Sequence, residues 1–273
     1  MSALFNLDTY FERINYQGTT TPTIDVLHAL SRAHTQSIPF ENLDVLLRRP
    51  ISLELDDIYR KLVIDRRGGY CFEQNNLLLE VLKRLGFTVT PWGARVRLRV
   101  TDRNILPVRT HVFLAVEVDG EQWIVDSGVG ALSLTQALRL QEGAEQTTPH
   151  ETRRLQRVGE SWFHQVVRDG AWIDVCGFTE QPMPASDQIV ANWYTSSHPD
   201  STFMTQLQVA LAQDNGGRIT LNNNELKLRQ ADGAAATYQV ADTELLDVLA
   251  EYFAIKLPAD ADISHITRFL RKA

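Results

Sequence analysis

The residue in this sequence best placed for chemistry is Cys71, which follows the glycine pair Gly68-Gly69 and begins an apolar run with helical spacing. This pattern predicts a thiol at a helix N-terminus, where the partial positive charge favours the thiolate, the nucleophilic form. The glycines would allow a tight turn and the close approach of a substrate. The alternative is a buried, inert cysteine in a core helix. The choice between the two depends on whether a base lies nearby.

A base and an acid that could orient it lie on a predicted β-hairpin. Alternating strands over 111–118 and 121–126 are joined by Asp119-Gly120, a strong signal for a two-residue turn. Counting from this turn places His111 and Asp126 on one face as diagonal neighbours. A register shift of one residue would move them to opposite faces.

Taken singly, His111 is explained as a polar group at a strand end and Asp126 as a turn former. Together with a cysteine at a helix N-terminus, they match the nucleophile, base and orienting acid of covalent catalysis. We therefore predict a catalytic triad of Cys71, His111 and Asp126.

The sequence around these three residues resembles the arylamine N-acetyltransferases, over roughly the first three quarters of the chain. Motifs in the same order are far more specific than any one of them alone. The matching segments are Ile38-Pro39-Phe40-Glu41-Asn42-Leu43-Asp44, 67–75 (Arg-Gly-Gly-Tyr-Cys-Phe-Glu-Gln-Asn), Thr110-His111, Asp126-Ser127-Gly128-Val129-Gly130 and 192–203. The resemblance implies the same triad, and an acetyl group carried on Cys71 from acetyl-CoA to an aromatic amine or hydrazine, with O-acetylation of N-hydroxyarylamines as a related activity. A role in xenobiotic metabolism follows from such substrates.

The resemblance also extends the predicted site beyond the triad. It implies that Phe40 lines the acceptor pocket, although ordinary core packing explains Phe40 equally well. It also implies that Phe203 faces the site from the lid region, with core packing as the alternative. It suggests that Arg67 pairs with Glu41. The predicted substrate-binding residues are Phe40, Val96, Val129 and Phe203, and the predicted cofactor-binding residues are Gly128 and Gly130, whose amides would approach the CoA pyrophosphate unless the glycines only form a tight turn.

One loop departs from the pattern of this family. The family usually has a phenylalanine between the two glycines after the aspartate, where this chain has Val129, and Ser127 and Ala131 are also less usual. A smaller valine removes an aromatic stacking surface and opens space. We expect an altered acceptor range, with some loss of activity on standard arylamines.

Composition excludes several classes of protein. The chain has 273 residues, 44% of them hydrophobic, and a net charge of −7, which disfavours nucleic-acid binding. We expect no membrane span, no signal peptide at Met1–Asn6 and no metal site, because no histidine pair has ligand spacing with a third ligand. The two cysteines fit a reducing cytoplasm, and Cys176 is predicted to be a core residue of a strand. Expected partners are acetyl-CoA, the small aromatic acceptor and a second copy in a homodimer.

The predicted fold class is α+β: a helical bundle over 1–87, a central antiparallel β-barrel over 88–187, and a connection with an α/β lid over 188–273. Segment 179–186, with two prolines, is predicted to be part of a loose connection, and Arg95, Arg97 and Arg99 to lie on the solvated face of a strand. The bundle helices are predicted at 7–14, 23–33, 55–64 and 71–85.

Other functions remain open from the residues alone. Helices followed by a barrel, with Cys, His and Asp in that order, also match papain-like proteases and transglutaminases at the level of the fold. The alternatives are an amide-forming acyltransferase with another thioester donor or a larger acceptor, a cysteine hydrolase, and a ligand-binding protein without catalysis.

Overall fold

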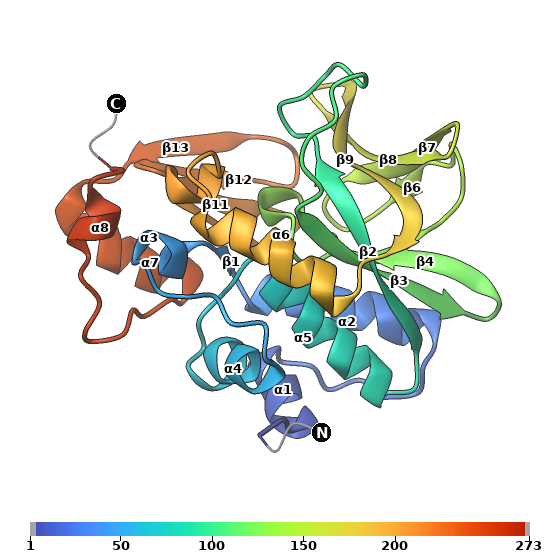
Figure 1. The fold of residues 1–273 in the computed structure, drawn as a ribbon, viewed down its shortest axis with the longest axis horizontal. Helices are drawn as coiled ribbons and strands as arrows, with labels where there is room; N and C mark the ends of the chain where they lie inside the picture. The colour runs from blue at the N-terminus through green and yellow to red at the C-terminus, as the bar shows by residue number, and fades with distance from the viewer. Residues whose placement is uncertain (1–3, 271–273) are drawn as a thin grey trace.

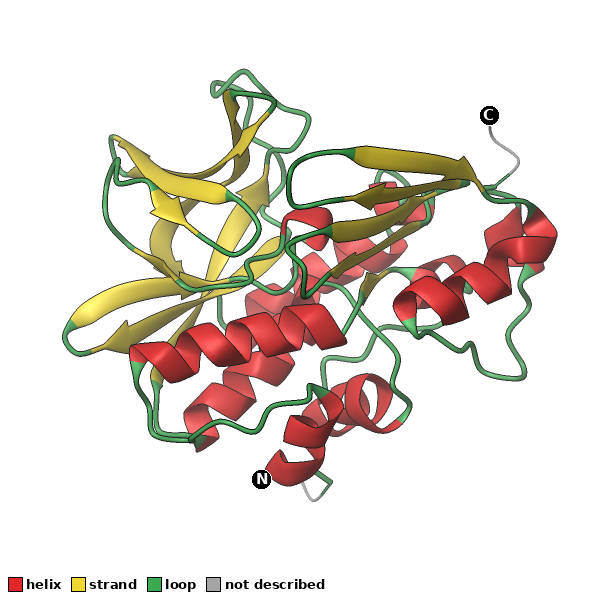
Figure 2. Cartoon of the chain, turned by 180° about the vertical axis from the view of Figure 1, so that it is seen from behind, coloured by secondary structure: helices red, strands yellow, loops and turns green. Residues whose placement is uncertain are grey.

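The structure, a computed structural model, describes residues 4–270. Met1–Ala3 and 271–273 lie outside the described residues. The first half of Met1–Asn6, where no signal peptide is expected, and the outer ends of the first and last predicted domains therefore also lie outside them. Figures 1 and 2 show two β-sheets next to each other above the N-terminal helices. Within 4–270, no helix is both long and apolar enough to cross a membrane.

The first part of the chain is helical, as the sequence predicts. Thr23 caps the second helix by accepting a hydrogen bond from the Val26 amide. The two short elements that sequence reasoning missed are β1 and α3, because neither is long enough to show a period. The elements are α1 (Leu7–Arg13), α2 (Ile24–Ser37), β1 (Phe40–Glu41), α3 (Leu43–Leu46), α4 (Leu55–Tyr59) with a π-helical turn (Arg60–Ile64), and α5 (Cys71–Arg84).

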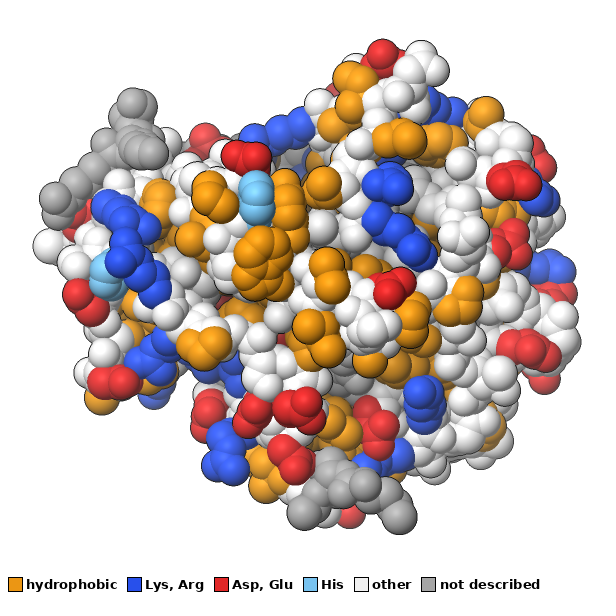
Figure 3. All heavy atoms as spheres, in the orientation of Figure 1, with side chains coloured by type: hydrophobic (Ala, Val, Ile, Leu, Met, Phe, Trp, Pro, Cys, Tyr) orange, Lys and Arg blue, Asp and Glu red, His pale blue; other side chains and the backbone are white. Residues whose placement is uncertain are grey.

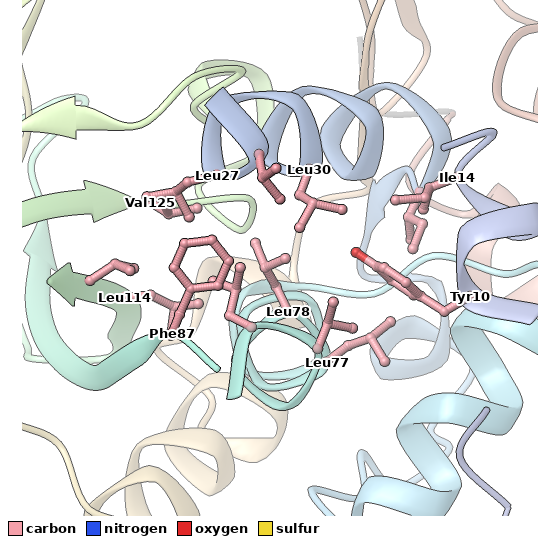
Figure 4. Packing of buried hydrophobic residues seen from close by; sticks show 14 of the residues in the cluster. Tyr10, Ile14, Leu27, Leu30, Leu77, Leu78, Phe87, Leu114 and Val125 are labelled. Atoms are coloured by element: carbon pink, nitrogen blue, oxygen red, sulfur yellow. The ribbon is translucent and has the colours of Figure 1, made fainter. Parts of the chain in front are cut away.

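A single hydrophobic cluster joins these helices to the hairpin that carries His111. In Figure 4, Leu27 and Leu30 of α2 face Leu77 and Leu78 of α5, and Leu114, from the first strand of the hairpin, joins the same cluster beside Phe87. All five leucine side chains are fully buried. This packing fixes α5, and therefore its N-terminus, against the sheet.

The larger sheet has eight antiparallel strands in the order β5-β4-β3-β2-β9-β8-β7-β6 and is nearly closed, like a barrel. The two edge strands, β5 and β6, are linked by the side chain of Gln146 and not by a backbone ladder. Its Oε1 accepts from the Arg139 amide (2.8 Å) and its Nε2 donates to the Arg139 carbonyl (3.0 Å). The strands are β2 (Thr88–Val96), β3 (His111–Val118), β4 (Glu121–Val125), β5 (Leu138–Arg139), β6 (Gln146–Thr147), β7 (Thr152–Val158), β8 (Ser161–Arg168) and β9 (Ala171–Pro182).

The register of the β3–β4 hairpin is the predicted one. Val118 pairs with Glu121 and Leu114 pairs with Val125. Asp119 and Gly120 have φ angles of +53° and +76°, the left-handed conformation that a tight hairpin turn requires.

The second sheet combines the C-terminal part with one early strand. Phe40 of β1 pairs with Ala210 of β10, so the order is β1-β10-β11-β12-β13. This pairing links the helical and C-terminal parts directly. The elements of the C-terminal part are α6 (Ala185–Ser197), β10 (Gln208–Ala212), β11 (Arg218–Asn222), β12 (Glu225–Arg229), β13 (Ala235–Gln239), α7 (Leu245–Phe253) and α8 (Ser264–Thr267), with 3₁₀ turns at Gly130–Leu132, Thr202–Met204 and Asp242–Glu244.

Two sequence-based expectations are wrong. Arg97 is 3% exposed instead of solvated, because β2 ends at Val96 and the guanidinium turns inward to donate to carbonyls of the following loop, at Asp102 (2.7 Å) and Ile105 (2.9 Å). Most of segment 179–186 is regular structure and not a loose connection. Its two prolines mark the last residue of β9 and the N-cap of α6, where no backbone N–H is needed.

A buried charge network holds the chain just before Cys71. Arg67 pairs with Glu41 (2.7 Å), as expected, and also with Asp44 (3.1 Å). Lys61 pairs with Asp44 and with Glu73, each at 2.7 Å. Burial alone lowers the pKa of Arg67, but Glu41 and Asp44 outweigh it and raise that pKa above its usual value.

Replacing Glu41 by Gln tests how much this network stabilises the fold. Because Glu41→Gln leaves Arg67 buried with one carboxylate fewer, we expect a loss of about 3 kcal/mol in the free energy of unfolding. The matched control is Glu80→Gln, which removes the exposed partner of Arg84 and should cost about 0.5 kcal/mol or less. Urea denaturation measures both, and equal losses would contradict the assignment.

Candidate active site

Cys71 is the first residue of α5 and is 4% exposed. Its Sγ lies 3.8 Å from the carbonyl oxygen of Thr110, the residue before β3. The helix start is held by Glu73, whose Oε2 accepts from the Tyr70 amide at 3.0 Å, and the Tyr70 hydroxyl donates to Asn192 of α6. The thiol therefore sits at a capped helix N-terminus and faces the β3 end of the hairpin.

His111 begins β3, and Asp126 directly follows β4. The two side chains are each 2% exposed, and His111 Nε2 donates to Asp126 Oδ2 at 2.7 Å. The structure therefore brings the predicted base and orienting acid into direct contact.

The charges around His111 favour its protonated form. Burial alone lowers its pKa, but the Asp126 carboxylate and the contact with Cys71 outweigh burial and raise the pKa to about 10. Burial likewise raises the pKa of Asp126, while His111, the Gly128 amide and Asn75 lower it more, so the carboxylate stays ionised. The raised pKa makes His111 a base that can take the proton of the neighbouring cysteine, and the ionised carboxylate behind it stabilises the imidazolium that forms, which is the arrangement that activates a nucleophile.

Asn75 is a site residue that sequence reasoning missed. It lies one helical turn after Cys71, and its Nδ2 donates to the Val112 carbonyl (2.7 Å) and to Asp126 Oδ1 (3.1 Å). Its Oδ1 accepts from the Ser127 amide (3.0 Å). One side chain thus bridges α5, β3 and the loop after β4. The available signal was a polar residue at position 75, at helical spacing from the apolar residues Leu78 and Leu82.

The two glycines of the loop after β4 have different surroundings. A Cβ on Gly128 would lie 2.4 Å from Cys71 Cα, so only glycine allows the loop to lie this close to the helix. Gly130 has a φ of +77°, and a Cβ on it would lie 3.4 Å from the ring of Phe40. By contrast, Gly68 and Gly69 let the Pro39 carbonyl and the Glu73 side chain approach, so their close neighbours belong to the chain itself.

A cavity of about 400 Å³ opens beside the thiol. Cys71 and His111 line it, as do all of the predicted substrate- and cofactor-binding residues: Phe40, Val96, Gly128, Val129, Gly130 and Phe203. The rest of the wall comes from the loop around Arg99 and Val108, from the end of α6, and from β10 and β11. Figure 3 shows hydrophobic side chains gathered on the front of the molecule, where α6 lies in Figure 1. The exposed apolar residues of α6 include Val190 and Trp193.

The second buried cysteine, Cys176, and the buried histidine His34 have structural surroundings. His34 donates to Gln74 (2.7 Å) and accepts from Tyr10 (2.8 Å), and burial lowers its pKa to about 4. Cys176 is a free, buried residue of β9, as expected, and burial raises its pKa. In residues 4–270, no group of three or more His, Cys, Asp and Glu side chains could hold a metal ion.

Comparison with known proteins identifies relatives in both sequence and fold. An N-acetyltransferase family model matches residues 23–262. The arylamine N-acetyltransferase of Mycobacterium tuberculosis (strain H37Rv) is 41% identical over 256 residues, 92% of this chain and 90% of the relative. A Salmonella typhimurium relative, 37% identical over 91% of this chain and 88% of its own length, is an arylamine N-acetyltransferase / N-hydroxyarylamine O-acetyltransferase.

Solved structures of such enzymes superpose closely. That of the M. smegmatis arylamine N-acetyltransferase has a TM-score of 0.93 at 38% identity and covers 98% of this chain and 99% of its own. The M. marinum enzyme, solved in complex with CoA, has a TM-score of 0.91 at 34% identity, with 97% and 98% coverage. The family model and these relatives define an acetyltransferase enzyme. The chain belongs to the arylamine N-acetyltransferase family.

Replacing Asp126 by Asn tests the pairing with His111. Because the carboxylate stabilises the protonated ring, Asp126→Asn should lower the pKa of His111 from about 10 toward or below its ordinary value. In the native chain, the stability contributed by this pair is present below the unfolded pKa of His and lost as the pH rises through about 10. Proton NMR titration measures the shift, with His111→Gln to identify the resonance.

The matched control is Asp200→Asn, which removes an exposed carboxylate from the same cavity. It should leave the titration of His111 unchanged. A His111 pKa that is the same in Asp126→Asn and in the native chain would contradict the pairing.

Proposed function

We propose that this enzyme transfers the acetyl group of acetyl-CoA to arylamines and arylhydrazines through an acetyl-cysteine at Cys71. The observation that carries the proposal is the contact of His111 with Asp126 at 2.7 Å, beside a cysteine that opens into a cavity of about 400 Å³. A nucleophile, a base and an orienting acid at one cavity wall suit acyl transfer. The CoA complex of the M. marinum relative supports the choice of donor.

The first half-reaction uses the proton of Cys71. His111 accepts this proton, and Asp126 stabilises the resulting imidazolium. The thiolate attacks the carbonyl carbon of the thioester, forming the new C–S bond. Backbone amides at the start of α5, including that of Cys71, stabilise the oxyanion. The bond to the CoA sulfur then breaks, and CoA leaves with the proton from His111.

The second half-reaction reverses these steps with a different nucleophile. The amine attacks the acetyl-enzyme while His111 accepts its proton, and the Cys71 sulfur leaves and is reprotonated. Because CoA must leave before the amine reacts at the same atom, the mechanism predicts ping-pong kinetics. The same chemistry accommodates a hydroxylamine oxygen as nucleophile, which the name of the Salmonella relative supports.

The cavity walls suggest where the acceptor binds. Phe40 and Phe203 pack edge to face with ring centroids 5.9 Å apart, and Tyr70 packs on Phe203 at 5.6 Å. An aromatic amine bound against Phe40 and Phe203 would present its nitrogen to Cys71. We assign Val96 and Val129, which belong to one apolar cluster, to an aliphatic part of this wall, and the amides of Gly128 and Gly130 to the CoA pyrophosphate. A cytoplasmic location, a homodimer, a role in xenobiotic metabolism and the three-domain division stay predictions.

The intact mass of the protein after exposure to acetyl-CoA, without acceptor, tests the proposal. We expect one acetyl adduct on the native chain, none on Cys71→Ala, and a normal adduct on the matched control Cys176→Ala. The control removes the other free, buried cysteine.

Each of the other possible outcomes of this mass measurement indicates a different function or a different nucleophile. Rapid release of CoA with no adduct would favour a cysteine hydrolase. No adduct and no CoA release would contradict acetyl transfer and favour another thioester donor or a binding role. An adduct that persists in Cys71→Ala would exclude Cys71 as the nucleophile.

Restoring the usual aromatic residue tests the altered loop. Val129 is 6% exposed and lines the cavity, so Val129→Phe has to extend its ring into that space. We expect kcat/KM for a small arylamine to rise about three- to tenfold through aromatic packing, and that for a bulky one to fall. Steady-state kinetics at saturating acetyl-CoA measures both.

The control is Val108→Phe, at a half-exposed position on the rim of the same cavity. It should change neither value by more than about twofold, in line with small effects at exposed sites. If Val129→Phe changed kcat/KM for the small and the bulky acceptor by the same factor, position 129 would not determine the acceptor range.

A further inference from the structure

We propose a second ligand site in this enzyme, a phosphate-binding recess between the two sheets. The recess has a volume of about 150 Å³ and is lined by Arg168, Arg218 and Arg229, with Glu151 as the one carboxylate in its wall. It shares no lining residue with the cavity beside Cys71. The recess is therefore a separate site from that of the proposed acetyl transfer.

The charges around the recess do not balance. Three arginines bind the single carboxylate of Glu151: Arg153 and Arg168 at 2.9 Å, and Arg218 at 2.7 Å. Arg229 lies at the same recess and, within residues 4–270, pairs with no carboxylate. The histidine next to Arg153 is neutral, because His164 Nε2 accepts from the Arg153 guanidinium at 3.0 Å and its pKa is lowered to about 3 by burial and by Arg153.

Much of this excess positive charge is buried. Arg153 is fully buried and Arg218 is 5% exposed. Burying unbalanced charge is costly, and burial lowers the pKa of Arg153 and also that of Arg168, to about 10, despite Glu151. Arg218 and Arg229 also face each other directly across strands β11 and β12, a like-charge pair that destabilises a sheet. An anion bound in the recess would relieve both costs.

The geometry fits a compact, multiply charged oxyanion. The three lining guanidinium groups come from three strands, at the end of β8, the start of β11 and the end of β12. Arg168 uses one nitrogen on Glu151, and the Arg229 guanidinium makes no hydrogen bond or ion pair among the described residues, so N–H groups remain free. Planar guanidinium forks bind phosphate oxygens in pairs. The rest of the wall, including His150, Thr152 and Gln230, is polar apart from small residues and Val167.

The test is calorimetric titration of the full chain with inorganic phosphate, near neutral pH and at fixed ionic strength set by chloride. We expect binding to the native chain and a loss of affinity of about tenfold or more in Arg229→Gln, since a hydrogen bond between two charged groups is removed. Arg229 is only half-buried on β12, so the variant should fold. The matched control, Arg139→Gln, removes an exposed arginine elsewhere in the barrel-like sheet and should bind as the native chain does.

A second control locates the anion. Arg99 lines the cavity beside Cys71, so Arg99→Gln should leave phosphate binding unchanged. No binding to the native chain, unchanged binding in Arg229→Gln, or loss in Arg99→Gln instead would each overturn the proposal. Glycerol 3-phosphate as a second titrant distinguishes the source of the phosphate: tighter binding than inorganic phosphate, lost in Arg229→Gln, identifies a phosphate monoester, and weaker binding identifies the free ion.

Discussion

The contact between the first turn of α5 and the loop after β4 is the constraint on which the rest of the structure depends. Gly128 lies so close to Cys71 that a single methyl group would meet the helix backbone 2.4 Å away. One turn further on, Asn75 binds a strand carbonyl, the Asp126 carboxylate and the Ser127 amide together. Because helix and hairpin are locked at this point, the positions of the thiol, the imidazole and the carboxylate are set before any substrate binds, as electrostatic preorganisation requires.

Two buried polar networks stabilise the segments that lead into this contact. The network of Arg67, Lys61 and their carboxylates holds the segment that leads into Cys71. His34, held by Tyr10 and Gln74, anchors the chain around Pro39, whose carbonyl accepts from Gln74 Nε2 at 2.8 Å. Buried networks of this kind rigidify a structure when every member has a partner. The helix start is therefore fixed by hydrogen bonds and ion pairs as well as by the apolar cluster beneath it.

The sequence predicted the elements whose signals are local. The Asp119-Gly120 turn with alternation on both sides was enough for the hairpin register, and the glycine pair with an apolar period was enough for the start of α5. It did not predict Asn75 as a bridge, Arg97 as a buried residue or β1 as a strand. Each of these depends on partners far along the chain or on where a strand ends, and a single sequence carries no direct record of such contacts. The cluster of arginines around Glu151 was not predicted for the same reason, since its members lie on four different strands.

The origin of the cavity walls has a consequence for how such an enzyme diversifies. Cys71, His111 and Asp126 all lie on α5 and one hairpin, whereas much of the cavity wall comes from segments after residue 190, including β10 and β11. Mutations in the wall can therefore accumulate without disturbing the reacting groups. A lineage could change its acceptors through drift in one region while selection preserves the chemistry in the other. The loop after β4 differs, because Val129 and its neighbours line the cavity from within the segment that is locked against α5, so change there affects both the acceptor and the reacting groups.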